Sequence, residues 1–383
     1  MLTKTDAYLR SVQQLQKKVF RRGINYSLDR FITALAALGN PHHVCTKAIH
    51  IAGTNGKGSV AHYITNSLQY MGHTVMTYTS PHIYDYTERF SRNSAPISRG
   101  VFSELLDEVT AVDPDDCLSE FECLTAMAFQ FAKRYPVDYA VIETGLGGRL
   151  DATNVLPHAV AIITDIDMDH TDILGDTLAK IAYEKAGIIK PGATVITHAD
   201  QPTEVMAVLQ SVARDRQATI HQAVWEKGDF HSRNQALVST ALRVMFPERE
   251  PVWEDVLANV ISLFGRFTPM EYRGVPCWVD VGHNVSAAKA MLGMGLPISE
   301  WVVGMQRHKN YEAVFQFLVD NNQSVRLFEF NPGVAAPYMA LPEHLRERVG
   351  EWRVATDTVV RNTLFFGSFH MMKALQKGFL LDA

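Results

Sequence analysis

The chain has few cysteines, no long apolar run and no excess of charge of either sign. Its four cysteines in 383 residues form no C-x-x-C pair, which argues against a zinc knuckle or a dithiol redox site. No apolar run reaches the roughly 18 residues of a membrane helix, and the N-terminus lacks the apolar stretch of a signal peptide. The net charge of −5 disfavours partners such as nucleic acid or an anionic membrane. These absences predict a cytoplasmic protein.

Short apolar segments alternate with helical ones over the first 200 residues. The strands that we expect are Ala48–Ala52, His73–Thr79, Val137–Glu143, Ala159–Thr164 and Ala193–Thr197. Helices are expected between them, over Val60–Tyr70, Val101–Val109, Leu124–Arg134 and Leu178–Ala186. The alternation predicts an α/β fold in which a mostly parallel, P-loop-type sheet carries helices on both faces.

The pattern weakens after Asp200 and then starts again. Residues 215–235 are polar and mixed, and a helix is expected over Gln235–Phe246. Further strands are expected at Pro276–Val281, Glu300–Val303, Ser324–Glu329 and Thr363–Phe366. We therefore expect two domains, residues 1–215 and a smaller Rossmann-like α/β domain over residues 222–383.

A glycine-rich loop follows the first expected strand. It reads Gly53-Thr54-Asn55-Gly56-Lys57-Gly58-Ser59, and a helical segment comes next. Strand, glycine turn and helix are typical of a phosphate-binding unit, in which Lys57 would neutralise nucleotide phosphates and Ser59 would bind magnesium. The loop departs from G-x-x-x-x-G-K-[ST], because Ile51 occupies the first glycine position and Gly58 separates Lys57 from Ser59.

Polar residues also follow the neighbouring strands. Glu143 ends its expected strand, and Ser80 and His170 come after strands, so we expect all three at the same sheet edge as the loop. Glu143 suits magnesium, whereas His170 is a less usual ligand and can equally be a hydrogen-bonded loop residue. Lys185 lies in a helix, and its ammonium cannot bind a metal, so a surface lysine is the simpler reading. The alternating Asp165, Asp167 and Asp169 do not form an EF-hand, because His170 occupies the glycine position.

Five motifs in order resemble the folylpolyglutamate synthase/dihydrofolate synthase family of the Mur ligase superfamily. They are Gly53–Ser59, Thr79-Ser80-Pro81-His82, Glu143–Asn154, Asp169-His170-Thr171 and Glu184-Lys185-Ala186-Gly187-Ile188. The resemblance implies an ATP-dependent ligase that activates the carboxylate of dihydropteroate or a folylglutamate as an acyl phosphate, which the amine of L-glutamate then attacks. It also implies one or two Mg²⁺ ions and a monomer.

The resemblance assigns roles by position. It places ATP at Thr54, Asn55, Gly56, Lys57, Gly58 and Ser59, and in the second domain at Asn234, Arg266, Asp280 and His283. It places the metal at Ser59, Ser80, Glu143, His170 and Lys185, where Lys185 would carry a CO₂-derived carbamate, and it makes Lys57, His170 and Lys185 catalytic. It places the pterin at Asn25, Tyr26, Ser27, Leu28, Ser119, Glu120, Phe121, Glu122, Leu150, Asp151 and Ala152.

The departures from the family pattern lie mostly in the second half. Phe264 replaces a usual proline, Gly282 replaces alanine, and His308-Lys309-Asn310 replaces a more acidic segment. Two alternatives therefore stay open. One is a ligase of peptidoglycan precursors, although the loop at Gly53 starts too early for the additional N-terminal domain of such enzymes. The other is a nucleotide-binding relative without catalysis.

Overall fold

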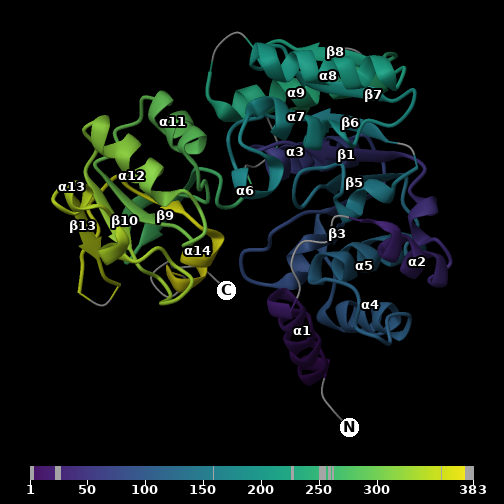
Figure 1. Cartoon of the computed structure of the whole chain (residues 1–383), viewed down its shortest axis with the longest axis horizontal. Coiled ribbons are helices and arrows are strands. Elements are labelled where there is room, and N and C mark those ends of the chain that lie inside the picture. The colour runs from purple at the N-terminus through teal and green to yellow at the C-terminus, as the bar shows by residue number, and fades with distance from the viewer. Residues whose placement is uncertain are drawn as a thin grey trace. The chain divides into compact units, whose positions relative to one another are not determined.

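The structure is a computed structural model of the chain. It describes residues 4–21, 27–157, 159–225, 228–249, 256–257, 260, 263–354 and 356–375. The chain divides into two compact units, the first made of Met1–Glu226 and Ser232–Val260, the second of Lys227–His231 and Ile261–Ala383. Each unit has its own sheet (Figure 1). Within the described ranges, no helix is long and apolar enough to cross a membrane.

The first unit is built on an eight-stranded sheet in the order β4-β3-β2-β5-β1-β6-β7-β8. The strands are β1 (Ala48–Ala52), β2 (Val75–Tyr78), β3 (Phe90–Arg92), β4 (Ala95–Pro96), β5 (Tyr139–Glu143), β6 (Val160–Ile163), β7 (Thr194–His198) and β8 (Thr219–Ala223). Strands β2, β5, β1, β6, β7 and β8 run parallel, while β3 and β4 are antiparallel. The carboxyl ends of six strands therefore lie at one edge of the sheet.

Helices cover both faces of this sheet. They are α1 (Lys4–Arg21), α2 (Asp29–Ala37), α3 (Lys57–Tyr70), α4 (Arg99–Ala111), α5 (Glu120–Arg134), α6 (Thr171–Leu174), α7 (Leu178–Ala186), α8 (Thr203–Asp215) and α9 (Phe230–Met245), with 3₁₀ turns η1 (Pro41–Val44), η2 (Tyr86–Arg89) and η3 (Ala152–Val155). Alternate residues of β1 face opposite layers: Ile49 and Ile51 pack with α3 and α9, and Ala52 packs with α7 and α8. Burial on both faces explains why every residue of β1 except His50 is apolar.

The second unit has a six-stranded sheet in the order β13-β12-β11-β14-β10-β9, in which only β9 is antiparallel to its neighbour. Its strands are β9 (Thr268–Tyr272), β10 (Val275–Asp280), β11 (Glu300–Gly304), β12 (Val325–Phe328), β13 (Val349–Trp352) and β14 (Thr363–Gly367). The helices are α11 (Val285–Gly293), α12 (Tyr311–Asp320), α13 (Glu343–Arg346) and α14 (Phe369–Leu375), with the 3₁₀ turn η4 (Tyr338–Ala340).

The expected fold class is confirmed, since both sheets are mostly parallel and lie between helices. Strand β1 and helix α7 have the expected bounds. The sequence did not predict β8, because three of its five residues are polar and the strand lies at an exposed edge. It also did not predict β9, which contains Pro269 and alternates partly buried with exposed positions.

The division between the units lies later in the sequence than the expected boundary at residues 215–222. Most of α9 belongs to the first unit, where Leu237, Val238 and Ala241 pack against the sheet. The polar segment that suggested a boundary contains β8 and the turn into α9. Strand β8 and most of helix α9 therefore belong to the first unit.

We predict that Leu237→Ala destabilises the protein by about 2–5 kcal/mol, because the side chain is fully buried in the core of the first unit. Thermal and chemical denaturation measure the loss. The matched control is Tyr70→Ala in α3, whose side chain is 67% exposed and whose removal should change stability little. Equal stability of the two variants would contradict the placement of α9.

Candidate functional site

The glycine-rich loop joins β1 to the N-terminus of α3. Helix α3 begins at Lys57, and Gly56 precedes it with a φ of 87°, a left-handed conformation that glycine adopts without strain. Ser59 lies in the first turn and is buried. The free N–H groups of this turn and the helix dipole favour an anion such as a phosphate.

Residues that follow β6 hold the loop in place. The Thr54 amide donates to the Asp165 carbonyl at 2.6 Å, and the Thr54 hydroxyl donates to the Asp167 carbonyl at 3.0 Å. The Thr164 hydroxyl donates to the Asn55 carbonyl at 2.6 Å. The aspartate run that resembles an EF-hand only superficially thus supports the loop through its backbone.

The loop also requires a residue without a side chain at position 53. A Cβ atom built on Gly53 would lie 1.8 Å from the Thr164 hydroxyl oxygen. No rearrangement of a flexible side-chain end relieves this clash, because Thr164 is buried and bonded to the loop.

Two lysines converge on this loop. Lys57 Nζ donates to the carbonyls of Gly53 at 3.1 Å and Thr54 at 3.2 Å. Lys185 Nζ, from α7, donates to the same Gly53 carbonyl at 2.7 Å. Lys185 is only 4% exposed, so it is no surface lysine but a buried group held against the phosphate loop.

Ser80 and Glu143 are also brought together. Ser80 follows β2, Glu143 is the last residue of the neighbouring strand β5, and the Ser80 amide donates to Glu143 Oε2 at 3.1 Å. The Glu143 side chain is almost fully buried, with 3% of its surface exposed. A buried carboxylate next to a serine offers the oxygen ligands that magnesium prefers.

His170 lies after β6, on the left-handed residue that precedes α6. Its amide donates to Asp169 Oδ1 at 2.9 Å, and its Nε2 lies 3.9 Å from Asp169 Oδ2. Among the described residues, no three His, Cys, Asp or Glu side chains cluster closely enough to hold a metal by themselves. A magnesium site here would need further oxygen ligands, such as serine hydroxyls and phosphate oxygens.

Segments expected to contact a pterin lie next to one another at α5. Ser119 and Glu122 form a capping box at the N-terminus of α5, and Glu122 also accepts from Arg30 Nη2 at 2.6 Å. Arg30 lies in the first turn of α2, which begins directly after Ser27 and Leu28. Glu120 accepts from the Tyr86 hydroxyl at 2.6 Å. Asn25 and Tyr26 lie outside the described residues.

The third expected segment, Leu150–Ala152, is connected to α5 through Gly145, which contacts both Phe121 and Asp151. The half-buried ring of Phe121 lies against Gly145, where an added Cβ would be 2.5 Å from its Cζ. Asp151 Oδ2 accepts from the amides of Gly145 and Leu146 at 2.9 Å each. Burial raises the pKa of Asp151, although these N–H donors oppose the rise.

Helix α9 contributes two residues to the phosphate side, of which only Asn234 was expected. The Asn234 Oδ1 lies 2.7 Å from the position of a Cβ on Gly56, so its amide covers the loop. Arg233 forms ion pairs with Asp165 and Asp200 and fixes α9 beside the aspartate run. The sequence feature that could have predicted such a residue is the acidic run from Asp165 to Asp169, because clustered carboxylates favour a basic partner.

The other three residues expected to bind ATP lie in the second unit. Asp280 is buried, and it accepts from the Phe267 amide at 3.0 Å and the Gly282 amide at 2.6 Å. Burial raises the pKa of Asp280, and the charge of Arg266 opposes the rise. His283 Nδ1 lies 3.2 Å from the Val281 carbonyl. These residues belong to the second unit, and their role in ATP binding stays a prediction.

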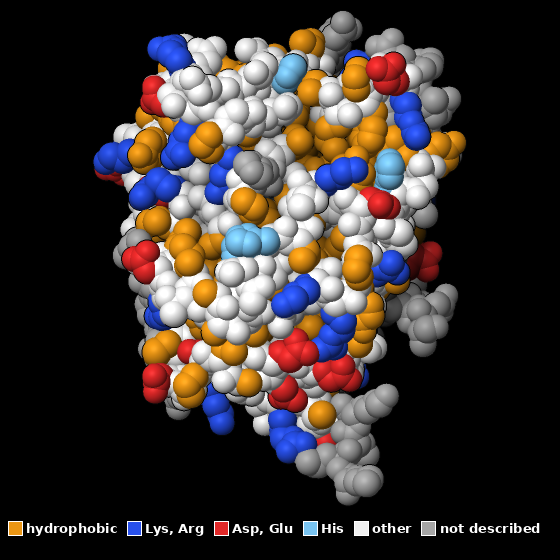
Figure 2. Space-filling model, turned by 90° about the vertical axis from the view of Figure 1, so that its right-hand side faces the viewer, with side chains coloured by type: hydrophobic (Ala, Val, Ile, Leu, Met, Phe, Trp, Pro, Cys, Tyr) orange, Lys and Arg blue, Asp and Glu red, His pale blue; other side chains and the backbone are white. Residues whose placement is uncertain are grey.

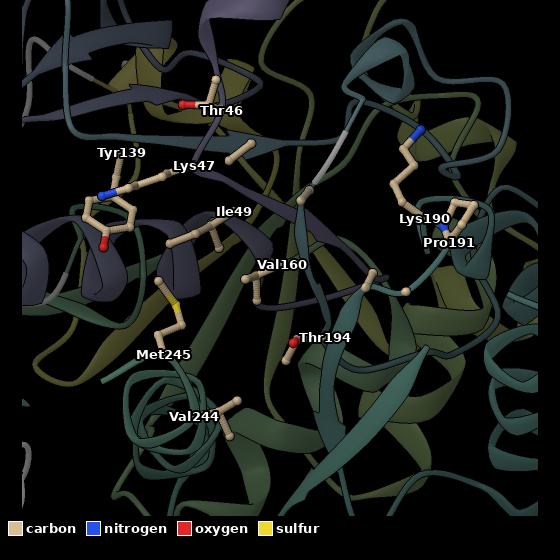
Figure 3. Close-up of a pocket in the computed structure, with 14 residues that line it drawn as sticks. Thr46, Lys47, Ile49, Tyr139, Val160, Lys190, Pro191, Thr194, Val244 and Met245 are labelled. Atoms are coloured by element: carbon tan, nitrogen blue, oxygen red, sulfur yellow. The ribbon is translucent and has the colours of Figure 1, made fainter. Parts of the chain in front are cut away.

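A cavity of about 400 Å³ lies at the opposite edge of the first sheet (Figure 3). Its lining includes Tyr139, Val160 and Thr194, which are the first residues of β5, β6 and β7. Because the phosphate loop follows the carboxyl end of β1, this cavity is not the expected nucleotide site.

On the face in Figure 2, Lys and Arg side chains are interspersed with Asp and Glu.

The chain resembles known proteins over most of its length. Residues 51–222 match the Mur ligase middle domain family. A Bacillus subtilis dihydrofolate synthase/folylpolyglutamate synthase is 38% identical over 310 residues, which are 79% of this chain and 71% of that protein.

Solved structures agree with this match. E. coli FolC in complex with DHPP and ADP superposes with a TM-score of 0.84 at 25% identity, covering 98% of each chain. A bifunctional folylpolyglutamate synthase/dihydrofolate synthase with Mn, AMPPNP and L-glutamate bound gives a TM-score of 0.82 at 25% identity, covering 98% of this chain and 99% of the other.

We predict that Gly53→Ala weakens nucleotide binding at least about tenfold, which corresponds to about 1.4 kcal/mol. The added methyl group would displace Thr164 and with it the loop. Calorimetric titration with an ATP analogue measures the change. Gly293→Ala is the control, since nothing lies within 4 Å of the added Cβ. Unchanged nucleotide affinity in Gly53→Ala would contradict the assignment of this loop.

Proposed function

The chain belongs to the folylpolyglutamate synthase/dihydrofolate synthase family, and on that premise we propose that it adds L-glutamate to dihydropteroate, to folylglutamates or to both, at the expense of ATP. The observation that carries the proposal is the convergence of Lys57 and Lys185 on the Gly53 carbonyl. This contact brings Lys185, which is expected at the metal site, next to Lys57 of the phosphate loop.

The reaction has two steps. The pterin carboxylate attacks the γ-phosphorus of ATP, which gives an acyl phosphate and ADP. The amine of L-glutamate then attacks the acyl carbon, loses a proton and displaces inorganic phosphate, which leaves an amide. Lys57 and the N-terminus of α3 would lower the barrier of the first step by stabilising charge on the transferring phosphoryl group.

Ser59, Ser80, Glu143 and His170 are the residues that we propose for one or two Mg²⁺ ions. The buried Glu143, oriented by the Ser80 amide, supplies a fixed negative charge beside the loop. When bound, the metal would neutralise the phosphate oxygens and polarise the phosphoryl group. The relative with Mn and AMPPNP bound supports a divalent ion together with a nucleotide.

We propose that Lys185 carries a carbamate. Its side chain is buried, and it lies against the loop at which we propose that the nucleotide phosphates and the metal bind. A carbamate keeps one N–H on Nζ, so the hydrogen bond to the Gly53 carbonyl would persist. The new carboxylate would add oxygen ligands and a negative charge, which explains how this lysine could serve a metal.

The pterin would bind where α2, α5 and η3 meet. Phe121 offers the face of an aromatic ring, which suits a flat heterocycle. Ser119 and Glu122 are engaged in the cap of α5, so we propose that they hold Phe121 in place. Asn234, Arg266, Asp280 and His283 remain our proposal for further ATP contacts, and a cytoplasmic monomer remains our proposal for the state of the protein.

One incubation tests the function. The protein receives ATP, Mg²⁺ and labelled L-glutamate together with either dihydropteroate or tetrahydrofolate. We expect label in at least one pterin product, and the labelled product identifies the preferred acceptor. Absence of label from both, with acceptance of a peptidoglycan precursor instead, would favour the alternative ligase. Nucleotide binding without any transfer would favour a protein that has lost catalysis.

We predict that Lys57→Ala reduces ligation by about 10²–10³-fold or more, because a charge that stabilises the transition state is removed. The side chain donates to loop carbonyls and is not among the buried core residues, so the melting temperature should change little. Lys180→Ala, which changes an exposed lysine of the first unit, is the control and should stay active. Retained ligation in a folded Lys57→Ala enzyme would refute the role of the loop lysine.

We predict that Lys185→Ala reduces ligation by about 10²-fold or more and that short carboxylates such as acetate or propionate partly restore it. The small acid would fill the space of the carbamate and replace its oxygen ligands. The measurement is glutamate incorporation with and without the added acid, and Lys180→Ala in the same helix serves again as the control. Wild-type activity of Lys185→Ala would remove the basis for a carbamate.

A further inference from the structure

A chain of buried polar side chains runs from β1 to the segment after β5. His50 Nε2 lies 2.7 Å from the Thr153 hydroxyl oxygen. That hydroxyl donates to Asp151 Oδ1 at 2.5 Å. His50 and Thr153 are fully buried, and Asp151 is 6% exposed. Bulk water therefore does not compete for these hydrogen bonds.

The protons of this chain can be assigned. Burial raises the pKa of Asp151, but its carboxyl accepts from the amides of Gly145, Leu146 and Thr153, and these three N–H donors favour the carboxylate, which is the form that we assign. The only hydroxyl proton of Thr153 goes to Asp151, so His50 must donate the proton on Nε2. Burial lowers the pKa of His50 to about 3, so the ring carries one proton at neutral pH.

His50 lies in the middle of β1, three residues before Gly53, and pairs in register with Ile142 of β5. Asp151, at the other end of the polar chain, holds the amides of the turn Gly145–Leu146, which follows Glu143. The ring of Phe121 rests on Gly145 in this turn. This series of buried hydrogen bonds thus connects the strand that precedes the phosphate loop with the surface on which the pterin would lie.

We propose that His50 and Thr153 are positioning residues for the pterin: they orient Asp151, which fixes the Gly145–Leu146 turn under Phe121. The inference rests on the proposed function, because it assigns the turn to the acceptor substrate. Neither side chain touches the substrate in this account, and neither takes part in proton transfer.

Kinetics of paired variants test the proposal. Thr153→Val and His50→Leu remove the hydrogen bonds at nearly constant volume, while Thr153→Ser and His50→Gln keep a donor near the same place. We expect the first pair to raise the KM for the pterin substrate about tenfold, as the loss of a buried hydrogen bond does. The KM for ATP should change less than twofold, and Ser and Gln should restore the pterin KM to within about threefold of wild type.

The double variant His50→Leu/Thr153→Val should have a pterin KM no higher than that of the more impaired single variant, because both changes break the same series of hydrogen bonds. A merely structural role would lower the melting temperature and would impair all substrates alike. A general rise in every KM, an unchanged pterin KM in a folded Thr153→Val protein, or additive effects in the double variant would overturn the proposal.

A second measurement does not depend on activity. Nitrogen-15 spectra of histidine-labelled protein, with His50→Gln to assign the signal, report the protonation of the ring. We expect a neutral ring protonated on Nε2 from pH 5.5 to 8. A ring protonated on Nδ1, or on both nitrogens, would refute the proposed series of hydrogen bonds. Failure of the wild type to label any pterin would instead refute the proposed function and leave this result intact.

Discussion

The Gly53 carbonyl oxygen organises the phosphate side of the first unit. It accepts from Lys57, which belongs to the loop's own helix, and from Lys185, which lies more than one hundred residues further along the chain. Both bonds require the backbone at position 53 to lie tightly against Thr164, where no side chain fits. One backbone atom therefore sets the position of both lysine side chains, and with it the charge of Lys57, relative to the N-terminus of α3. An anion that binds there meets charge whose position is already fixed.

The acceptor side depends on a comparable arrangement of backbone and buried side chains. Asp151 holds the turn at Gly145, and Phe121 rests on that turn. Both sides of the proposed site originate from β1, since Gly53 follows this strand and His50 lies within it. A shift of β1 would therefore disturb the nucleotide and the acceptor together, which suits a reaction in which their distance determines the rate.

Much of this arrangement follows from the sequence, because local patterns encode it. The bounds of β1 and α7 follow from a continuous apolar run and a helical period, and the loop at Gly53 follows from its glycines. Buried contacts between distant segments leave no such pattern. Nothing local indicates that Lys185 is buried against Gly53, or that His50 pairs with a threonine one hundred and three residues away. Likewise, the edge strand β8 is too polar to resemble a strand, so its place in the first sheet could not be read from the sequence.

The central claim is that one site couples phosphoryl transfer to the attack of glutamate. Steady-state release of ADP, measured over many turnovers with each substrate omitted in turn, tests this claim most directly. The account predicts sustained ADP release only when the pterin acid and L-glutamate are both present, because the acyl phosphate stays on the enzyme until the amine consumes it. Equally fast, sustained ADP release without L-glutamate would contradict it.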